Sequence, residues 1–197
     1  MALLPLVKAP DPRLKKVSEP IVEVDKQLRR FMDDMLETMY DENGIGLAAI
    51  QVGVPKRLAV IDLDPKGPDS KRLYIINPVI VAASGEESTY NEGCLSVPEF
   101  WEDVHRPAQI TVEYMDEKGQ KQRIEADGLF ATCLQHEIDH INGMLFIDHL
   151  SKLKRSIALR KSATVKRSQK DAYIACKGVD FLMSRWSHSL RREINVP

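Results

Sequence analysis

The stretch His136-Glu137-Ile138-Asp139-His140 decides much of what this chain can be. It lies in an apolar segment, Gly128–Asn142, that we expect to form a helix, with Asp127 at its start and Gly143 at its end. Two histidines four residues apart lie on neighbouring turns of one helix face. Both imidazoles can therefore reach a single metal ion.

Glu137 falls in the middle of the apolar stripe of this helix. At about 100° per residue, four apolar side chains fall within about 60° of it: Phe130, Cys133, Leu134 and Ile141. A carboxylate in such surroundings is costly unless it is paired or protonated, which argues against two surface histidines beside a surface acid. Burial raises the pKa of such a carboxyl and a cation lowers it, so it can exchange protons near neutral pH.

A metal site that keeps one position open needs a third protein ligand. The later histidines, His149 and His188, stand in no recognisable motif. Cys94, within Glu92-Gly93-Cys94-Leu95-Ser96, is the better candidate because a thiolate is a strong ligand for divalent metals. A lone Gly-Cys pair usually marks a buried free cysteine, so the residues alone leave this ligand open.

The rest of the chain shows a further helix and a mostly antiparallel strand pattern, without βαβ alternation. Apolar side chains recur with helical period over Lys26–Asp41, where Asp25 is the expected N-cap and Asn43-Gly44 the stop. A hairpin turn is expected at Glu117-Lys118-Gly119. Short strands are expected at Arg57–Leu63, Arg72–Ala83, Gln109–Met115 and Lys121–Glu125.

Composition fits one globular domain with a tail and excludes a fully disordered chain. The 197 residues carry a net charge of −1 with 43% hydrophobic residues, and no stretch approaches a membrane span or a secretory signal. Three cysteines, Cys94, Cys133 and Cys176, are a poor disulfide framework and fit a reducing compartment. We expect a domain at 1–150, a basic helix at 151–167 and an extension of unknown structure at 168–197.

Charge is unevenly distributed along the chain. Residues 151–170 contain eight of the 28 Lys and Arg residues and no acid, whereas the remainder holds all 29 acidic residues. A basic arm on an acidic body suggests a polyanionic partner. From charge alone, a solvated helix that happens to be basic is the favoured interpretation.

Three motifs together resemble the peptide deformylase family. They are Gly44–Gln51 (GIGLAAIQ), Glu92–Ser96 (EGCLS) and Gln135–His140 (QHEIDH), in that order. The resemblance covers about residues 5–165 and implies an α+β fold. In that fold three small antiparallel sheets pack around a central helix that bears the HExxH motif, and a C-terminal helix follows. It also implies an enzyme that removes the N-formyl group from formyl-methionyl nascent peptides. The implied compartment is the bacterial cytoplasm, and an organellar form remains open.

The resemblance also implies a role for each motif residue. Cys94, His136 and His140 become ligands of one divalent metal, physiologically Fe(II), with Zn, Ni or Co possible in a preparation. Glu137 becomes the general acid/base that acts on metal-bound water. The Gln51 side-chain amide and the Leu95 backbone N–H become donors to the formyl oxygen. Substrate-binding residues are expected at Gly44, Ile45, Gly46, Gly93, Leu129 and Cys133, although core packing explains Cys133 equally well.

Other features are left open by the sequence. We hypothesise that Glu92 and Asp139 hydrogen-bond the metal-binding imidazoles. Trp101 stands where several relatives carry Arg, and it either contacts substrate or is packed. The basic residues 152–170 resemble a C-terminal helix that some bacterial relatives use to bind the ribosome, whereas 168–197 has no counterpart. The competing functions are a general metallopeptidase and a non-catalytic ribosome-associated module with a structural metal.

Overall fold

The structure is a computed structural model that describes residues 2–68 and 70–164. The chain divides into a compact unit, Met1–Ser162, and a second unit, Ala163–Pro197. Only residues 163 and 164 of the second unit are described. The predicted extension 168–197, with Cys176 and His188, therefore lies outside the described residues, and the predicted boundary at residue 150 stays a prediction.

Two α-helices form where the sequence predicts them. Helix α1 (Lys26–Asp41) starts at Asp25, whose side chain accepts a hydrogen bond from the Leu28 N–H. Helix α2 (Gly128–Ile141) ends before Gly143, which has a left-handed φ of 77° and lies close to the Lys15 carbonyl. Asp127 occupies the N-cap position of α2 as expected, but its side chain makes no capping hydrogen bond.

All the strands pair antiparallel, in two sheets within the described residues. The larger sheet has the order β1-β2-β3-β6-β7, and β4 and β5 form a two-stranded hairpin. The bounds are β1 Gly46–Ala48, β2 Leu58–Ile61, β3 Leu73–Ala83, β4 Glu87–Cys94, β5 Val97–Pro107, β6 Gln109–Met115 and β7 Lys121–Asp127. The described residues also form three 3-10 helices: η1 Pro12–Lys15 before α1, η2 Ala49–Val52 between β1 and β2, and η3 Phe146–His149 after α2.

The expected number of three sheets is wrong for the described part of the chain, because β3 joins two of them. The first half of β3 pairs with β2 and the second half with β6, across a register shift at Asn77-Pro78. Asn77 has a φ of 52°, and its side-chain amide makes two hydrogen bonds to the Ile21 backbone. This bulge bends one continuous strand, so β1–β2 and β6–β7 belong to a single sheet.

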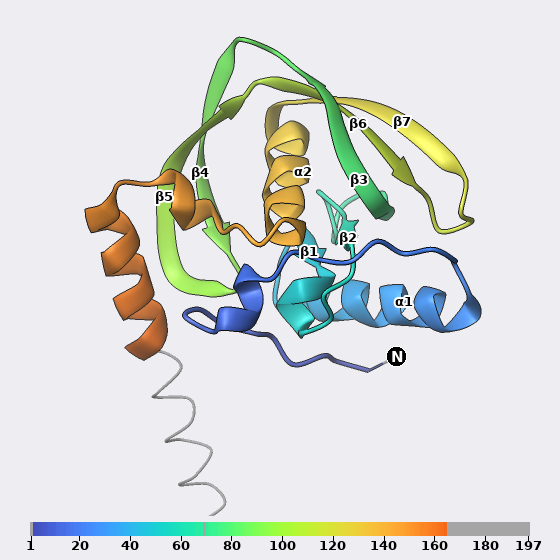
Figure 1. Ribbon diagram of the computed structural model, residues 1–197, viewed down its shortest axis with the longest axis horizontal. Helices are drawn as coiled ribbons and strands as arrows, with labels where there is room; N and C mark the ends of the chain where they lie inside the picture. Colours follow the sequence, from blue (N-terminus) through green and yellow to red (C-terminus); the bar gives the residue numbers. More distant parts are fainter. Residues whose placement is uncertain (1, 69, 165–197) are drawn as a thin grey trace, which may run out of the picture. The chain divides into compact units, whose positions relative to one another are not determined.

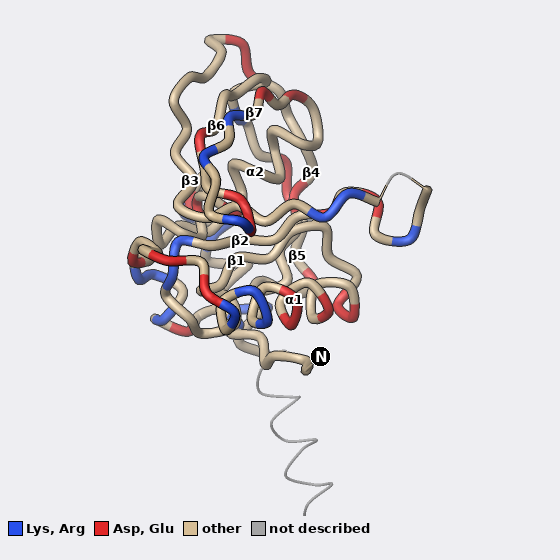
Figure 2. Tube along the Cα trace, turned by 90° about the vertical axis from the view of Figure 1, so that its right-hand side faces the viewer, with Lys and Arg blue, Asp and Glu red and all other residues tan. Residues whose placement is uncertain are grey.

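Helix α2 lies between the two sheets, with α1 on the outer side of β1 and β2 (Figure 1). Apolar side chains of α2 pack on the larger sheet in one cluster, and α1 closes a second cluster through Met35 and Met39. The α2 helix is therefore buried on most sides, and the predicted α+β architecture around a central helix is confirmed. Figure 2 shows acidic residues along α1 and both charge types in the β2–β3 loop.

A further helix, residues 152–164, covers the described part of the predicted basic helix. Ala158 is fully buried against the β5 side of the fold, and the Ser162 hydroxyl donates to the Ala9 carbonyl at 2.7 Å. Lys154 pairs with Glu102 at 3.0 Å, and the Lys161 ammonium lies over the Phe100 ring. This helix is thus docked on β5. Among the described residues no helix is both long and apolar enough to cross a membrane.

Candidate metal centre and active site

The predicted metal ligands converge. One ligand atom each from Cys94, His136 and His140 lies within 4.8 Å of the other two. The Cys94 Sγ is 3.2 Å from the His140 Nε2, and the two imidazole rings are 5.0 Å apart between centroids. Cys94 comes from the end of β4, while the histidines occupy successive turns of α2. A thiolate with two imidazoles is a donor set that fits zinc, iron, cobalt or nickel, and three protein ligands leave one position open.

Glu92 fixes the orientation of the first histidine. Its carboxylate Oε2 is 2.9 Å from the His136 Nδ1. Because a carboxylate only accepts, Nδ1 carries the proton and Nε2 is left as the ligand atom. Burial raises the pKa of Glu92, but its bonds to His136 and Arg106 outweigh this and lower it. The expected hydrogen bond between Glu92 and one of the two imidazoles is therefore present.

Asp139 does not support the second histidine, and that expectation is wrong. Its carboxylate accepts hydrogen bonds from Arg106 and from the His149 ring, both at 2.8 Å. The His140 Nδ1 is buried with no hydrogen-bond partner in the described structure. Burial, together with the neighbouring His136, lowers the pKa of His140 well below its ordinary value. His140 is therefore neutral, the form in which an imidazole binds a metal.

Glu137 is buried as its place in the apolar stripe predicts, with 3% of its surface exposed. Burial raises its pKa to about 7, although the charge of His136 opposes the shift. Its Oε2 has no hydrogen-bond partner among the described residues. A carboxyl with a pKa near neutrality, beside a three-ligand metal centre, is suited to accept and return a proton.

Gln51 is held with its amide N–H groups toward the centre. The Ala48 N–H donates to its Oε1 at 2.8 Å, which identifies the other end as the nitrogen. The Nε2 lies 3.2 Å from the Ser96 hydroxyl and 3.6 Å from the Cys94 Sγ. Leu95 lies in the tight turn between β4 and β5, directly after Cys94. Both predicted donors thus belong to residues adjacent to the Cys94 sulfur.

A cavity of about 550 Å³ opens over this cluster. The buried His140 is not part of its lining, whereas all other predicted site residues are. Those predicted to bind substrate are Gly44, Ile45, Gly46, Gly93, Leu129 and Cys133. Burial and the charge of Glu137 raise the pKa of the Cys133 thiol well above its ordinary value, so it remains protonated.

Trp101 forms one edge of the cavity. Its indole is 61% exposed and lies against Gly93, where any Cβ would approach the indole nitrogen to 2.2 Å. Of the two interpretations left open for Trp101, the structure therefore favours an exposed cavity wall over core packing. Glycine at position 93 lets the indole lie directly on the β4 backbone.

Sequence reasoning missed some residues at this site. The most important is Arg106, whose guanidinium is buried between Glu92 and Asp139. The alternation of Val104 and Arg106, which lie on one face of β5, is a weak signal that was present in the sequence. The missed cavity residues carry no motif: Lys8, Glu42, Asn43, Tyr90, Asn91, Pro98, Glu99 and Thr132.

Comparison with known proteins gives a consistent result. Residues 3–156 match the family described as Polypeptide deformylase. The chain is 57% identical over 161 residues to a peptide deformylase of Rhizobium meliloti (strain 1021), covering 82% of this chain and 92% of that protein. A peptide deformylase crystal structure from Legionella pneumophila matches with a TM-score of 0.81 and 45% identity, covering 86% of this chain and 98% of that one. One from Ehrlichia chaffeensis, in complex with actinonin, matches with a TM-score of 0.80 and 44% identity, covering 85% and 99%.

Proposed function

The chain belongs to the peptide deformylase family, and on that premise we propose which of its residues carry out the reaction. It is a metal-dependent hydrolase that removes the formyl group from the N-terminal formyl-methionine of nascent polypeptides. The observation that carries our residue assignment is the convergence of one thiol and two imidazoles beside the buried carboxyl of Glu137.

Cys94, His136 and His140 hold the metal in this proposal. A bound divalent ion supplies a Lewis acid that polarises the formyl oxygen and acidifies water. We propose Fe(II) as the physiological ion, with Zn, Ni or Co able to occupy the same soft and borderline ligands. The mutual distances of the three ligand atoms and the neutral state of His140 support this.

Glu137 acts as the general acid/base. With a pKa of about 7 it is partly ionised at neutral pH, so its carboxylate accepts a proton from the attacking water. It then returns that proton to the leaving amine nitrogen as the C–N bond breaks. The products are formate and a free α-amino group. Burial keeps other proton donors away from the carboxyl.

Gln51 and Leu95 stabilise the oxygen on which negative charge develops. The Gln51 amide is fixed before substrate arrives by its bonds to the Ala48 N–H and the Ser96 hydroxyl, which is the condition under which such a donor contributes most. The Leu95 backbone N–H, in the β4–β5 turn directly after Cys94, is the second donor in this proposal. The methionine side chain enters the cavity between Ile45, Leu129 and Cys133. Gly44, Gly46 and Gly93 allow the peptide backbone to come close, and Trp101 contacts the residues that follow.

Formate release from formyl-Met-Ala-Ser, with acetyl-Met-Ala-Ser as the control, tests the activity. We expect hydrolysis of the formyl peptide alone, because the acetyl group adds a methyl to the carbonyl carbon, which crowds the attack and makes that carbon less electrophilic. Cleavage of internal peptide bonds in the acetyl peptide would instead favour the general metallopeptidase. Metal uptake with no hydrolysis of either peptide would favour the non-catalytic module.

Gly46 gives a first prediction about this site. In Gly46→Ala the new Cβ would lie 2.4 Å from the Glu137 Oε1 and 3.0 Å from the Cys133 Sγ, so the carboxyl must move. A displacement of this size costs on the order of 10²-fold in kcat. Gly85→Ala is the matched control, because a Cβ at Gly85 meets no atom within 4 Å. Steady-state kinetics on formyl-Met-Ala-Ser measure both, and a wild-type kcat for Gly46→Ala would contradict the placement.

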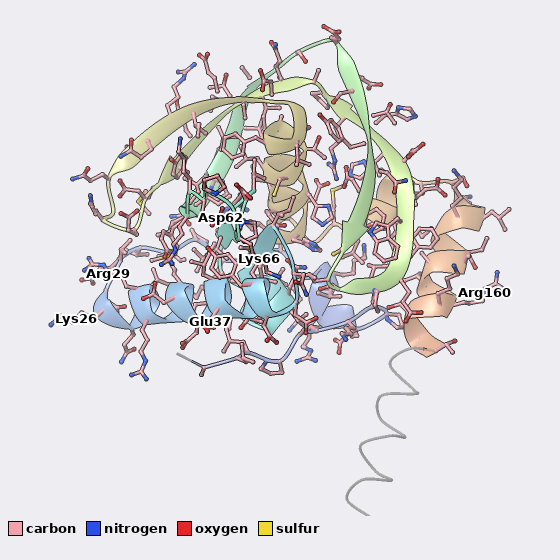
Figure 3. The ribbon with its side chains drawn as sticks, turned by 180° about the vertical axis from the view of Figure 1, so that it is seen from behind. Lys26, Arg29, Glu37, Asp62, Lys66 and Arg160 are labelled. Carbon is pink, nitrogen blue, oxygen red and sulfur yellow. The ribbon has the colours of Figure 1, made fainter. Side chains whose placement is uncertain are left out.

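We also propose that the basic residues 152–170 bind the ribosome in the bacterial cytoplasm, where formylated chains emerge. All five basic side chains of the described helix are exposed, and Lys154, Arg155 and Lys161 also contact Glu102, Asp148 and Phe100. Lys152 and Arg160 are exposed, and Arg160 extends from the side away from β5 (Figure 3). The peptide deformylase of Rhizobium meliloti to which this chain is 57% identical is a bacterial protein, which supports the compartment.

Ribosome binding predicts a salt-dependent loss on removing these exposed charges. In the double variant Lys152→Gln with Arg160→Gln, the slope of log affinity against log salt should decrease by about 1 per lost phosphate contact. Co-sedimentation of the full-length chain with ribosomes over a salt series measures this. The control carries Lys118→Gln and Lys121→Gln, two exposed lysines at the β6–β7 hairpin. Equal slopes for the two double variants would contradict the proposal.

A further inference from the structure

Arg106 is a buried arginine beside the candidate metal centre, with 4% of its surface accessible. Its Nε and one terminal nitrogen bind both oxygens of Glu92, at 2.6 and 3.1 Å. Its other terminal nitrogen binds the Asp139 Oδ2 at 2.8 Å. One guanidinium on β5 thus joins a carboxylate of β4 to a carboxylate of α2.

His149 extends this network of hydrogen bonds from Asp139 to the protein surface. The His149 Nε2 on η3 is 2.8 Å from the same Asp139 Oδ2, and 31% of the His149 side chain is exposed. At the inner end, Glu92 accepts from the His136 Nδ1. An unbroken series of hydrogen bonds therefore leads from solvent to a metal-binding imidazole, in the order His149, Asp139, Arg106, Glu92, His136.

The energetics of a buried arginine explain why this series is rigid. A buried guanidinium is strongly destabilising unless its donors are paired. Here each of the three guanidinium nitrogens of Arg106 donates a hydrogen bond to a carboxylate oxygen. The two parallel bonds to Glu92 fix the plane of that carboxylate as well as its position. A lysine has one nitrogen and cannot reproduce the fork.

We propose that Arg106 and His149 are positioning residues of the metal centre. Arg106 locks Glu92 so that the His136 Nδ1–H has one acceptor in one place, which leaves the Nε2 lone pair directed at the metal. His149 holds Asp139 on the far side of Arg106, so that the guanidinium stays in the plane that suits Glu92. This rests on the proposed ligation by His136, and it assigns both residues an effect on metal binding without contact to metal or substrate.

Arg106→Lys and His149→Phe test this. Outer partners of metal-binding histidines contribute about 10–100-fold to metal affinity. We expect Arg106→Lys to weaken Zn(II) binding within that range and His149→Phe to weaken it several-fold. The measurement is competition between the metal-free full-length protein and a chelator. In the Co(II)-loaded protein, the visible absorption bands should shift in both variants, because the His136 ring changes its orientation.

Arg57→Lys is the matched control. Arg57 is a half-buried arginine that binds the Asn142 side chain just beyond α2 and the Pro78 carbonyl, each at 2.9 Å. These contacts involve no side chain of a proposed metal ligand, so Zn(II) affinity and the Co(II) spectrum should match the wild type. Folding of every variant is compared by thermal unfolding of the metal-free form.

The metal-binding measurements on these variants test the positioning roles separately from the formate assay. Wild-type Zn(II) affinity and an unshifted Co(II) spectrum in a folded Arg106→Lys would overturn the proposal. If Arg106→Lys does not fold, His149→Phe decides it alone, since its side chain is partly exposed, and an unchanged Co(II) spectrum there has the same consequence. A wild type that binds Zn(II) but releases no formate would refute the assigned reaction and leave this inference standing.

Discussion

Replacing Glu137 by alanine is expected to lower kcat for formyl-Met-Ala-Ser by about 10³–10⁴-fold, near the upper end of what a general acid/base contributes. In the proposed mechanism the same carboxyl accepts the proton of the attacking water and returns it to the amine, so its loss should slow two steps. No other carboxylate replaces it, because the next one, Glu92, is held by Arg106 and His136. Formate release by anaerobically prepared proteins of equal metal content is the measurement.

Two further variants make this result specific. Glu137→Gln keeps the shape of the side chain but accepts no proton, and it should be as slow as the alanine variant. Glu87→Gln removes an exposed carboxylate from the far end of β4 and should retain wild-type kcat. If Glu137→Gln kept more than a tenth of the activity, proton transfer through this residue would be the wrong mechanism.

The sequence predicted the elements whose hydrophobic period is regular. Helix α1 and strand β6 form at the predicted residues, and α2 differs only at its last residue. The hairpin of β4 and β5 was missed, because β4 is polar along most of its length and the buried residues of β5 are unevenly spaced. Its strands are specified by pairing with each other and by the helix at residues 152–164, neither of which leaves a local pattern.

The residues of the site likewise fall into those that the sequence predicts and those that it does not. Glu137 was predictable because a carboxyl on an apolar stripe needs a chemical reason, and Cys94 because its motif accompanies two others. Arg106 and His149 were not predictable, since their role depends on carboxylates that lie 14 and 10 residues away in the chain. Long-range pairing of charged side chains is set by the tertiary fold. For the same reason the expectation for Asp139 was wrong: the Asp139 carboxylate accepts from Arg106 and not from the His140 ring.

Replacing Cys94 by alanine is expected to abolish stable metal binding and, with it, activity. Cys94 provides one of the three candidate ligand atoms that converge in the described structure, and its Sγ lies 3.2 Å from the His140 Nε2. Two histidines alone bind divalent ions weakly. The loss in Zn(II) affinity should therefore exceed the about 10–100-fold that an outer partner contributes. Metal content after gel filtration, with chelator competition, measures it.

The control for this loss is the second described cysteine. Cys133 is also in the cavity wall, but its raised pKa keeps it a thiol and it is not one of the clustered ligand atoms. Cys133→Ser should therefore retain a full complement of metal, whatever it does to methionine binding. Metal retained by Cys94→Ala, or lost equally from both variants, would refute the ligand set. Loss from Cys94→Ala alone would tie the β4–β5 turn to the metal centre and support the proposed role of Leu95, the next residue, as a donor to the formyl oxygen.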